Sequence, residues 1–412
     1  MRLLHISTFD ILGGAARAAY RIHKSLQKIG VDSWMLVQNK NGDDPSVLGP
    51  KTKVKKFLNL FRPFIDQLPV KIYKNKSNIL FSPSWLGLND ILSGIEELKP
   101  DIVHLHWVCG GYLRIGQITK IKQPIVWTLH DMWAFTGGCH YDENCNLYKT
   151  TCGHCKVLRS DKLKDLSHVG FKRKKRIYEE KKDLFVVGIS RWISECAKSS
   201  SLLKDKVHLV IHNPIDIDLY KPIRKELARE IWNLPKDKKF ILFGAESPTY
   251  DLRKGYKELT EALKKVKSSD TELVIFGRSS SQTPFDFGFK AHYVGYLSDD
   301  ISLVTLYNCA DVVVVPSLQE NLSNTIMESL SCGVPVVAFD IGGNPDMIEH
   351  KTNGYLAKPY DTDDLASGID WVLNDSDYNT LSLNARHKVI SNFESICVAN
   401  KYFKLYESIL AQ

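Results

Sequence analysis

Short apolar runs alternate with segments of helical period along the chain. Each run is rich in Val, Ile, Leu and Phe, and each is short enough to be a strand buried on both faces of a sheet. Strands that alternate with helices are typical of parallel sheets, so the pattern predicts doubly wound α/β units. A helix is predicted over 15–29. The predicted strands of the first half are 2–8, 32–38, 102–107, 125–130, 184–190 and 207–212.

The alternation restarts in the second half, which favours two domains in tandem over one large sheet. The predicted strands there are 240–244, 273–277, 291–297, 312–316 and 334–339, and the predicted helices are 255–267, 299–309 and 324–332. Pro214 disfavours helix at the preceding residue, so we place the break there. The predicted parts are an N-terminal domain over 1–212, a C-terminal domain over 213–392, and a helix over 393–412 that packs back on the first domain.

Two segments, 39–99 and 139–182, do not fit the alternation and are predicted to be insertions. The chain of 412 residues has a formal net charge of +8, and most of the excess of Lys and Arg lies in its first half. Basic runs at Lys51–Lys56 and Lys172–Arg176 indicate either solvated helix faces or contact with an anionic membrane surface. Nucleic acid is disfavoured as a partner, because these runs lack a zinc-finger, RRM or helix-turn-helix signature.

Apolar stretches long enough to span a bilayer, about 18 to 20 residues, are missing from the sequence. The start of the chain also lacks the apolar core and cleavage site of a signal peptide. We therefore expect a cytoplasmic protein.

Residues that suit phosphate and sugar chemistry follow several predicted strands, where ligands of such sheets bind. Gly13 and Gly14 come after the first strand and before a helix, which places backbone N–H groups where a phosphate can bind. The alternative there is an ordinary tight turn. His130 ends a strand and is followed by Trp133, whose indole could stack on a sugar; a structural histidine is the alternative.

The second half holds the stronger signal. Arg253 and Lys254 follow a strand and suit a leaving diphosphate, although two solvated bases are the alternative. Glu320 and Glu328 follow the strand over 312–316, one on a loop and one within a helix, and carboxylates accept hydrogen bonds from vicinal hydroxyls. The start of that helix offers N–H groups to phosphate. The residues predicted to bind there are Leu322, Ser323, Asn324 and Thr325.

At these motifs the chain resembles glycosyltransferase family 4, the retaining enzymes of the GT-B fold. The resemblance runs over nearly the whole chain, and its most specific part is the E-x7-E pair followed by Gly-Val-Pro. The motifs that carry it are Gly13-Gly14, His130, Asn213-Pro-Ile-Asp216, Lys254-Gly255, and Glu320 with Glu328.

The resemblance implies two Rossmann-like domains that face each other across a cleft, with a nucleotide-diphosphate sugar of UDP or GDP type as donor. Glu320 would hold hydroxyls of the donor sugar, and Glu328 those of the ribose. Lys254 would neutralise the diphosphate, the Gly14 amide would approach phosphate, and His130 would lie near the reacting carbon. The implied mechanism is front-face displacement with retention, without an enzymic nucleophile.

Two features bear on these assignments. The family has Gly-Arg-Leu at a strand end where this chain reads Gly244-Ala-Glu246, so Arg253 is the available substitute for that arginine. Asp216 and Asp218 spell D-x-D, a metal-binding signature of another glycosyltransferase fold. Because they lie in the predicted domain link, we interpret them as structural and expect no catalytic divalent metal.

Four cysteines are clustered at Cys139, Cys145, Cys152 and Cys155. Cytosolic chains rarely keep disulfides, and a four-thiol loop that ends in C-x-x-C can hold zinc. Structural zinc, free thiols, an iron–sulfur cluster and disulfides all remain open. A similar stretch is found in exopolysaccharide and colanic-acid glycosyltransferases, which implies a role in bacterial surface polysaccharide assembly.

We therefore predict a retaining hexosyltransferase that acts on a carbohydrate or a lipid-linked oligosaccharide acceptor at the inner membrane face. An epimerase or sugar-phosphate synthase on the same fold is one alternative. A scaffold subunit without catalytic activity is another.

Overall fold

The computed structural model describes residues 1–87, 90–244, 252–268, 270–277, 287–297 and 299–412. It divides the chain into two compact units, Met1–Pro214 with Val398–Gln412, and Ile215–Cys397. The predicted break fell between 212 and 213. Among the described residues, no helix is both long and apolar enough to cross a bilayer.

The first unit is a seven-stranded parallel sheet with strand order β3-β2-β1-β4-β5-β6-β7. Its strands are β1 (Arg2–Phe9), β2 (Asp32–Asn39), β3 (Val47–Leu48), β4 (Ile102–Leu105), β5 (Ile125–Leu129), β6 (Leu184–Gly188) and β7 (Val207–Val210). Its helices are α1 (Gly14–Lys28), α2 (Lys53–Asp66), α3 (Asp90–Leu98), α4 (Leu166–Glu180), α5 (Arg191–Ser199) and, from Val398 onward, α13 (Ser395–Leu410).

Side chains of this sheet alternate between two apolar layers. Leu4 and Val103 point into a core shared with α3, α4 and α5, whereas Leu3 and Ile102 point into one shared with α1 and α13. The second layer explains why the last helix belongs to the first unit. The hydroxyl of Tyr402 lies 3.0 Å from that of Thr128, within the apolar layer that α13 covers.

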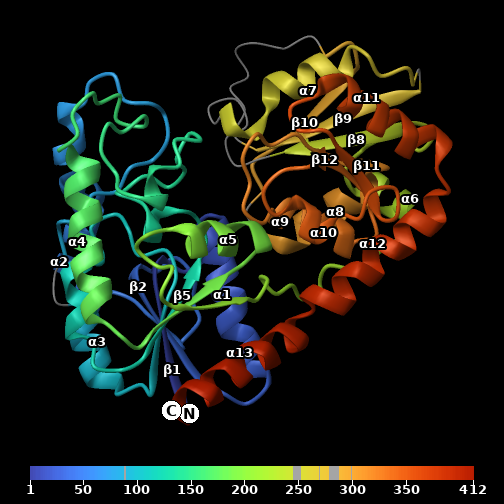
Figure 1. Cartoon of the computed structure of the whole chain (residues 1–412). Helices are drawn as coiled ribbons and strands as arrows, with labels where there is room; N and C mark the ends of the chain where they lie inside the picture. The colour runs from blue at the N-terminus through green and yellow to red at the C-terminus, as the bar shows by residue number, and fades with distance from the viewer. Residues whose placement is uncertain (88–89, 245–251, 269, 278–286, 298) are drawn as a thin grey trace. The chain divides into compact units, whose positions relative to one another are not determined.

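The second unit is a six-stranded parallel sheet with order β10-β9-β8-β11-β12-β13 (Figure 1). Its strands are β8 (Lys239–Gly244), β9 (Thr271–Phe276), β10 (Ala291–Gly295), β11 (Val312–Val315), β12 (Val336–Phe339) and β13 (Gly354–Ala357). Its helices are α6 (Lys225–Ile231), α7 (Tyr256–Leu263), α8 (Asp300–Cys309), α9 (Asn324–Ser331), α10 (Asn344–Met347), α11 (Thr362–Asp370) and α12 (Tyr378–Phe393).

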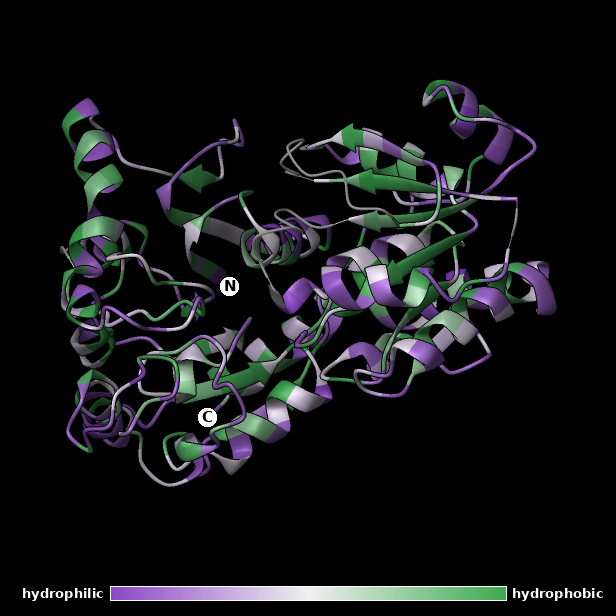
Figure 2. Ribbon diagram, turned by 90° about the horizontal axis from the view of Figure 1, so that it is seen from above, coloured by the Kyte–Doolittle hydropathy of each residue, from purple (hydrophilic) through white to green (hydrophobic). Residues whose placement is uncertain are grey.

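The prediction of two doubly wound α/β units is confirmed, and all eleven predicted strands appear with shifts of a few residues at their ends. Figure 2 shows these strands mainly in the colour of hydrophobic residues. The sequence reading missed β3 and β13. β3 has two residues and β13 begins at a glycine, so neither presents an apolar run long enough to register as a strand.

Candidate functional site

The second unit gathers predicted residues at the carboxyl edge of its sheet. β8 lies between β9 and β11 in the sheet. From β8 the chain passes to β9 and β10 on one side, and it then crosses to β11 and β12 on the other side. This is the point where strand order reverses, at which loops on the carboxyl side diverge and leave room for a ligand. Lys254 follows β8 and Glu320 follows β11, so both lie at that point.

Lys254 and Glu320 form an ion pair across these two loops. The Lys254 Nζ donates to Glu320 Oε2 at 2.8 Å. The lysine side chain is 32% exposed and the glutamate side chain 12%, so the pair is open to solvent on the lysine side. A cation and a carboxylate held this close present both groups that a sugar diphosphate needs, a charge for phosphate and an acceptor for hydroxyls.

Close backbone packing holds the two loops together. The Leu318 amide donates to the Arg253 carbonyl at 2.7 Å. Gly255 has φ of +69°, and a Cβ there would lie 1.8 Å from the Pro316 carbonyl oxygen. Only glycine fits such a position, because it lacks the side chain that would meet the neighbouring backbone.

A third loop, which follows β12, packs on the same place. Gly342 has φ of +53°, and a Cβ on it would lie 1.8 Å from the carbonyl oxygen of Glu320. The Gly343 amide donates to that same oxygen at 3.3 Å. The backbone of Glu320 is therefore held by the loops of its neighbours. Residues 245–251, including Glu246, lie outside the described part of the chain.

Helix α9 begins directly after Glu320. Ser323 is its N-cap and accepts from the Ile326 amide, and its first turn holds no acidic residue, which leaves the positive end of the helix dipole for an anion. Leu322 and Ser323 are buried, whereas Asn324 and Thr325 are partly exposed.

Glu328 lies one turn into α9. It is 4% exposed and accepts from the Tyr307 hydroxyl at 2.9 Å. Burial raises the pKa of Tyr307 well above its usual range, so the tyrosine keeps its proton and holds the carboxylate in one orientation.

Gly13, Gly14 and His130 belong to the first unit. Gly13 has φ of +84° and is the N-cap of α1, and Gly14 is exposed at the first position of the helix. The first turn of α1 also lacks an acidic residue. These features are compatible with an anion at the start of α1, and the phosphate contact there stays a prediction.

His130 is the outer member of a chain of imidazoles that the sequence reading did not find. Its Nε2 lies 3.1 Å from Nδ1 of His106, and Nε2 of His106 lies 2.9 Å from Nδ1 of His5. Each contact shares one proton, so the tautomers along the chain are linked. His5 Nε2 is buried and has no partner within the described part of the chain.

An orphaned buried N–H is rarer than an orphaned lone pair. The favoured arrangement therefore leaves a lone pair at His5 Nε2 and makes each imidazole donate toward His130. In that arrangement His130 accepts at Nε2 and carries its proton on Nδ1. Burial lowers the pKa of His130 to about 4, so the ring is neutral near pH 7.

The structure corrects two expectations in this region. Trp133 is 3% exposed, and the ammonium group of Lys174 lies 3.7 Å from its ring centre, so its face is not available for stacking on a sugar. Lys174 itself is buried and donates to the carbonyl groups of Trp133 and Thr136. The run 172–176 is therefore not a wholly solvated basic face.

The clustered cysteines are mostly buried. Cys139, Cys152 and Cys155 are 5–6% exposed and Cys145 is partly exposed. Within the described ranges, the one set of at least three His, Cys, Asp or Glu side chains whose ligating atoms lie within 4.8 Å of one another is His5, His104 and His106. The four thiols do not form such a set.

Two of the three histidines in this set, His104 and His106, have both ring nitrogens in hydrogen bonds. Both ring nitrogens of His104 have partners, at 2.7 Å from Thr128 Oγ1 and 2.7 Å from the Tyr406 hydroxyl. Both nitrogens of His106 are bonded to the neighbouring histidines.

The D-x-D sequence at Asp216 and Asp218 forms a local turn, in which the Asp216 carboxylate accepts from the Asp218 and Leu219 amides.

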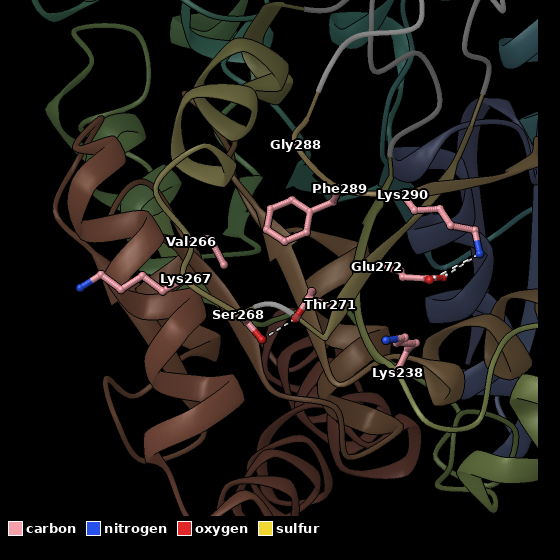
Figure 3. Close-up of a pocket in the computed structure, with 9 residues that line it drawn as sticks. All are labelled: Lys238, Val266, Lys267, Ser268, Thr271, Glu272, Gly288, Phe289 and Lys290. Atoms are coloured by element: carbon pink, nitrogen blue, oxygen red, sulfur yellow. Dashed lines mark hydrogen bonds and ion pairs between the residues drawn. The ribbon is translucent and has the colours of Figure 1, made fainter.

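A cavity of about 440 Å³ lies at the amino ends of strands of the second sheet, whereas Lys254 and Glu320 follow carboxyl ends. Figure 3 shows the residues that line it. Lys238, Thr271 and Lys290, which line it, stand at the amino ends of β8, β9 and β10. Glu272 forms an ion pair there with Lys290 at 3.4 Å and a hydrogen bond with His292 at 2.6 Å. The predicted donor residues do not line this cavity.

The sequence matches two protein-family patterns that together cover most of the chain. The sequence pattern described as Glycosyltransferase Family 4 matches residues 12–219, and the pattern described as Glycosyl transferases group 1 matches residues 224–393. The chain belongs to glycosyltransferase family 4. Its enzymatic class, a glycosyltransferase, and its GT-B fold are as the sequence predicted.

Two relatives and two solved structures illustrate the similarity. The chain is 27% identical over 352 residues to a putative colanic acid biosynthesis glycosyl transferase, WcaC, of Escherichia coli, covering 82% of this chain and 83% of that protein. It is 28% identical over 225 residues to N,N'-diacetylbacillosaminyl-diphospho-undecaprenol alpha-1,3-N-acetylgalactosaminyltransferase of Campylobacter jejuni, covering 53% of this chain and 58% of that protein.

The solved structures share the fold at low identity. Sucrose-phosphate synthase from Thermosynechococcus elongatus aligns with a TM-score of 0.68 and 19% identity over 100% of both chains. Alr3699/HepE from Anabaena, solved in complex with UDP and glucose, aligns with a TM-score of 0.64 and 16% identity over 99% of this chain and 100% of that one.

The sequence offered only weak signals for the site residues that it did not predict, which are the buried histidines and Tyr307. On β1, His5 faces His104 of the neighbouring strand β4, and His106 follows β4. A histidine within or next to an apolar strand was the sequence signal that could have indicated these residues. Tyr307 had no local signal, because its contact with Glu328 depends on how α8 packs against α9.

Buried neutral histidines make stability depend on pH. Burial lowers the pKa of His104 to about 3, from about 6.5 in an unfolded chain. Between these values the unfolded state binds more protons, so stability is full above pH 6.5 and falls on acidification. We expect His104 alone to cost about 2 kcal/mol by pH 5, measured by urea unfolding at pH 7 and pH 5.

The matched comparison is His104→Gln against His387→Gln, since His387 is exposed. His104→Gln should weaken the pH dependence and His387→Gln should leave it unchanged. Equal dependence in both variants would contradict the assignment.

Proposed function

We propose that this family 4 enzyme transfers a hexose from a nucleotide-diphosphate sugar, with retention, to a carbohydrate or polyprenyl-linked acceptor in bacterial surface polysaccharide biosynthesis. The observation that carries the proposal is the Lys254–Glu320 pair at the strand-order reversal, beside the start of α9. A charge for phosphate, an acceptor for hydroxyls and a helix N-terminus stand together there.

The donor assignments follow from these positions. Lys254 neutralises the diphosphate, with Arg253 beside it, and Glu320 accepts hydrogen bonds from the sugar. Glu328, held by Tyr307, accepts from the ribose hydroxyls. The amides from Leu322 to Thr325 face phosphate. HepE, which shares the fold, was solved with UDP and glucose, which supports a donor of UDP or GDP type.

In the first unit, the proposed roles are a phosphate contact from the amides of Gly13 and Gly14 and a sugar contact from His130. A neutral imidazole at His130 can donate a hydrogen bond to a sugar oxygen without adding a charge near the reacting carbon. The lack of an acidic residue in the first turn of α1 and the neutral state of His130 support these roles.

The reaction we propose is a front-face displacement. The bond between the anomeric carbon and the phosphate oxygen breaks as the bond to the acceptor oxygen forms on the same face. The acceptor proton passes to an oxygen of the departing phosphate. Lys254 stabilises the charge that grows on that phosphate, so the chain has to supply charge and orientation rather than a nucleophile.

The acceptor class is supported by the relatives. One is named for colanic acid biosynthesis and another for transfer to an undecaprenol-linked sugar. An acceptor of that kind is anchored in a membrane, so we propose that the enzyme works at the inner face of the cell membrane.

A sugar-phosphate synthase or an epimerase on the same fold is the second candidate. The alignment with sucrose-phosphate synthase shows the shared fold at 19% identity. Products formed with a soluble sugar phosphate, or without any acceptor, would favour that candidate. The Lys254–Glu320 pair and the buried Glu328 disfavour a scaffold without activity.

The first test is Glu320→Ala. We expect loss of transfer by at least 100-fold, because the variant removes the carboxylate that orients the sugar and leaves Lys254 without its partner. Transfer from labelled nucleotide sugars to a membrane extract is the readout, with circular dichroism to check the fold. The matched control is Glu230→Ala, which breaks an exposed pair with Lys236. Near-normal turnover in Glu320→Ala would refute the donor assignment.

Structural zinc in the cysteine loop stays a prediction. Cys139 and Cys155 pack in one buried cluster, and burial raises the pKa of the Cys139 thiol. Zinc would require the side chains to turn inward, since the four sulfurs do not lie within 4.8 Å of one another. We expect about one zinc per chain by elemental analysis, and lower thermal stability after chelation. Stable metal-free protein would remove the site.

A further inference from the structure

Helix α2 is amphipathic in the reverse of the usual sense. A surface helix normally turns its apolar face to the core and its polar face to water. In α2 the buried residues are Asn59, Arg62 and Asp66, at spacings of three and four that mark one face of the helix. The polar face of this helix is therefore the one that packs on the protein.

Each of the first two buried polar groups has a defined partner. The Asn59 amide donates to the carbonyl of Gln38 in β2 at 2.5 Å, and Gln38 returns a hydrogen bond to the Asn59 carbonyl at 3.3 Å. Arg62 is 4% exposed and pairs with Asp90 at the start of α3. These contacts fix which side of α2 faces inward.

The opposite side is apolar and exposed. Leu60 is 70% exposed, and Ile72, in the short helix over Leu68–Ile72 that follows, is 79% exposed. We call this the α2 surface, and it consists of Val54, Phe57, Leu58, Leu60, Phe61, Phe64, Ile65, Leu68 and Ile72. A contiguous apolar surface of this kind marks a site of interaction, because leaving it in water is unfavourable. Figure 1 draws α2 at the periphery of the first unit.

The exposed charges of segment 51–76, which carries the α2 surface, have one sign. Segment 51–76 holds seven exposed lysines, which are Lys51, Lys53, Lys55, Lys56, Lys71, Lys74 and Lys76. Its single acid, Asp66, is fully buried. Lys51 and Lys55 pair with acids on α3. Lys71 lies over the Phe64 ring at 3.6 Å, so the basic and apolar groups share one face.

We propose that the α2 surface lies in the interface of an anionic lipid bilayer, with its apolar side chains among the acyl chains and its lysines at the lipid phosphates. An amphipathic helix with Phe and Leu on one face and lysines at its border binds membranes in this way. A protein partner is disfavoured because its binding patch would have to match both a broad apolar face and the seven exposed lysines of segment 51–76.

This inference deepens the proposed function, because a lipid-linked acceptor lies at the same interface. It gives a role to α2, which lies within the segment 39–99 that did not fit the strand and helix alternation. Docking would hold the first unit at the bilayer, where a polyprenyl-linked sugar is confined.

The test is flotation of the full chain with vesicles of phosphatidylglycerol and phosphatidylcholine, compared with phosphatidylcholine alone. We expect binding to the anionic vesicles that weakens as salt rises. Leu60→Gln with Phe64→Gln should lower vesicle binding at least tenfold. Lys53→Glu with Lys56→Glu should lower it by at least about 30-fold by the electrostatic contribution alone.

Matched controls lie in the second unit. Ile301→Gln with Leu383→Gln removes two apolar side chains of similar exposure, 70% and 71%, and should leave vesicle binding unchanged. Lys236→Glu with Lys257→Glu reverses the charge of two lysines in the second unit and should also leave vesicle binding unchanged. Thermal melting checks that each variant is folded.

Three results would overturn the proposal. One is equal binding to neutral and anionic vesicles, and another is the absence of binding. The third is a dimer without vesicles that Leu60→Gln converts to monomer, which would make the α2 surface an interface between copies. Nucleotide binding is measured in parallel, so a failure of docking is distinguished from a failure of the proposed function.

Discussion

The ion pair between Lys254 and Glu320 is the interaction on which the account depends. Opposite charges attract, but here the partners come from loops after different strands, and they meet only because β8 and β11 are neighbours in the sheet. The backbone contacts at Gly255 and Gly342 bring those loops close enough. Without a ligand, the charges of Lys254 and Glu320 balance each other. A bound sugar diphosphate would replace this contact with one between Lys254 and phosphate and one between Glu320 and the sugar hydroxyls.

Polar groups on the inside of the first unit serve a second purpose. The chain from His5 through His106 sets the proton position on His130. In α2, buried Asn59 and Arg62 use their hydrogen bonds to turn an apolar face outward. In both places burying polar groups costs stability unless they are paired, and the pairing fixes an orientation that apolar packing alone would not.

The sequence predicted the fold well because the apolar runs of buried parallel strands are continuous and separated by helices. It also predicted that Lys254 and Glu320 each follow a strand, and the structure has them there, whereas their roles in donor binding stay predictions. It did not predict the contact of Tyr307 with Glu328 or the histidine chain, because these depend on packing between elements distant in sequence.

Two other features show the same limit. Trp133 was expected to face a sugar, yet the ammonium group of Lys174 covers its ring. The position of Trp133 close to His130 in the sequence does not indicate which side chain packs on the indole. The reversed polarity of α2 could have been found from the spacing of Asn59, Arg62 and Asp66. Which of its faces is buried depends on Gln38 and Asp90, and only the structure supplies those contacts.

The most direct test of the donor site is a calorimetric and thermal-shift panel of UDP, GDP, ADP and their common sugar conjugates on the purified protein. A ligand that binds only the folded state adds about 2.7 kcal/mol at 100 times its Kd, which the panel resolves. We expect one diphosphate to stabilise the protein selectively, Glu328→Ala to abolish that response, and Tyr307→Phe to weaken it. Absence of a response to all of these nucleotides, or an unchanged response in Glu328→Ala, would contradict the account.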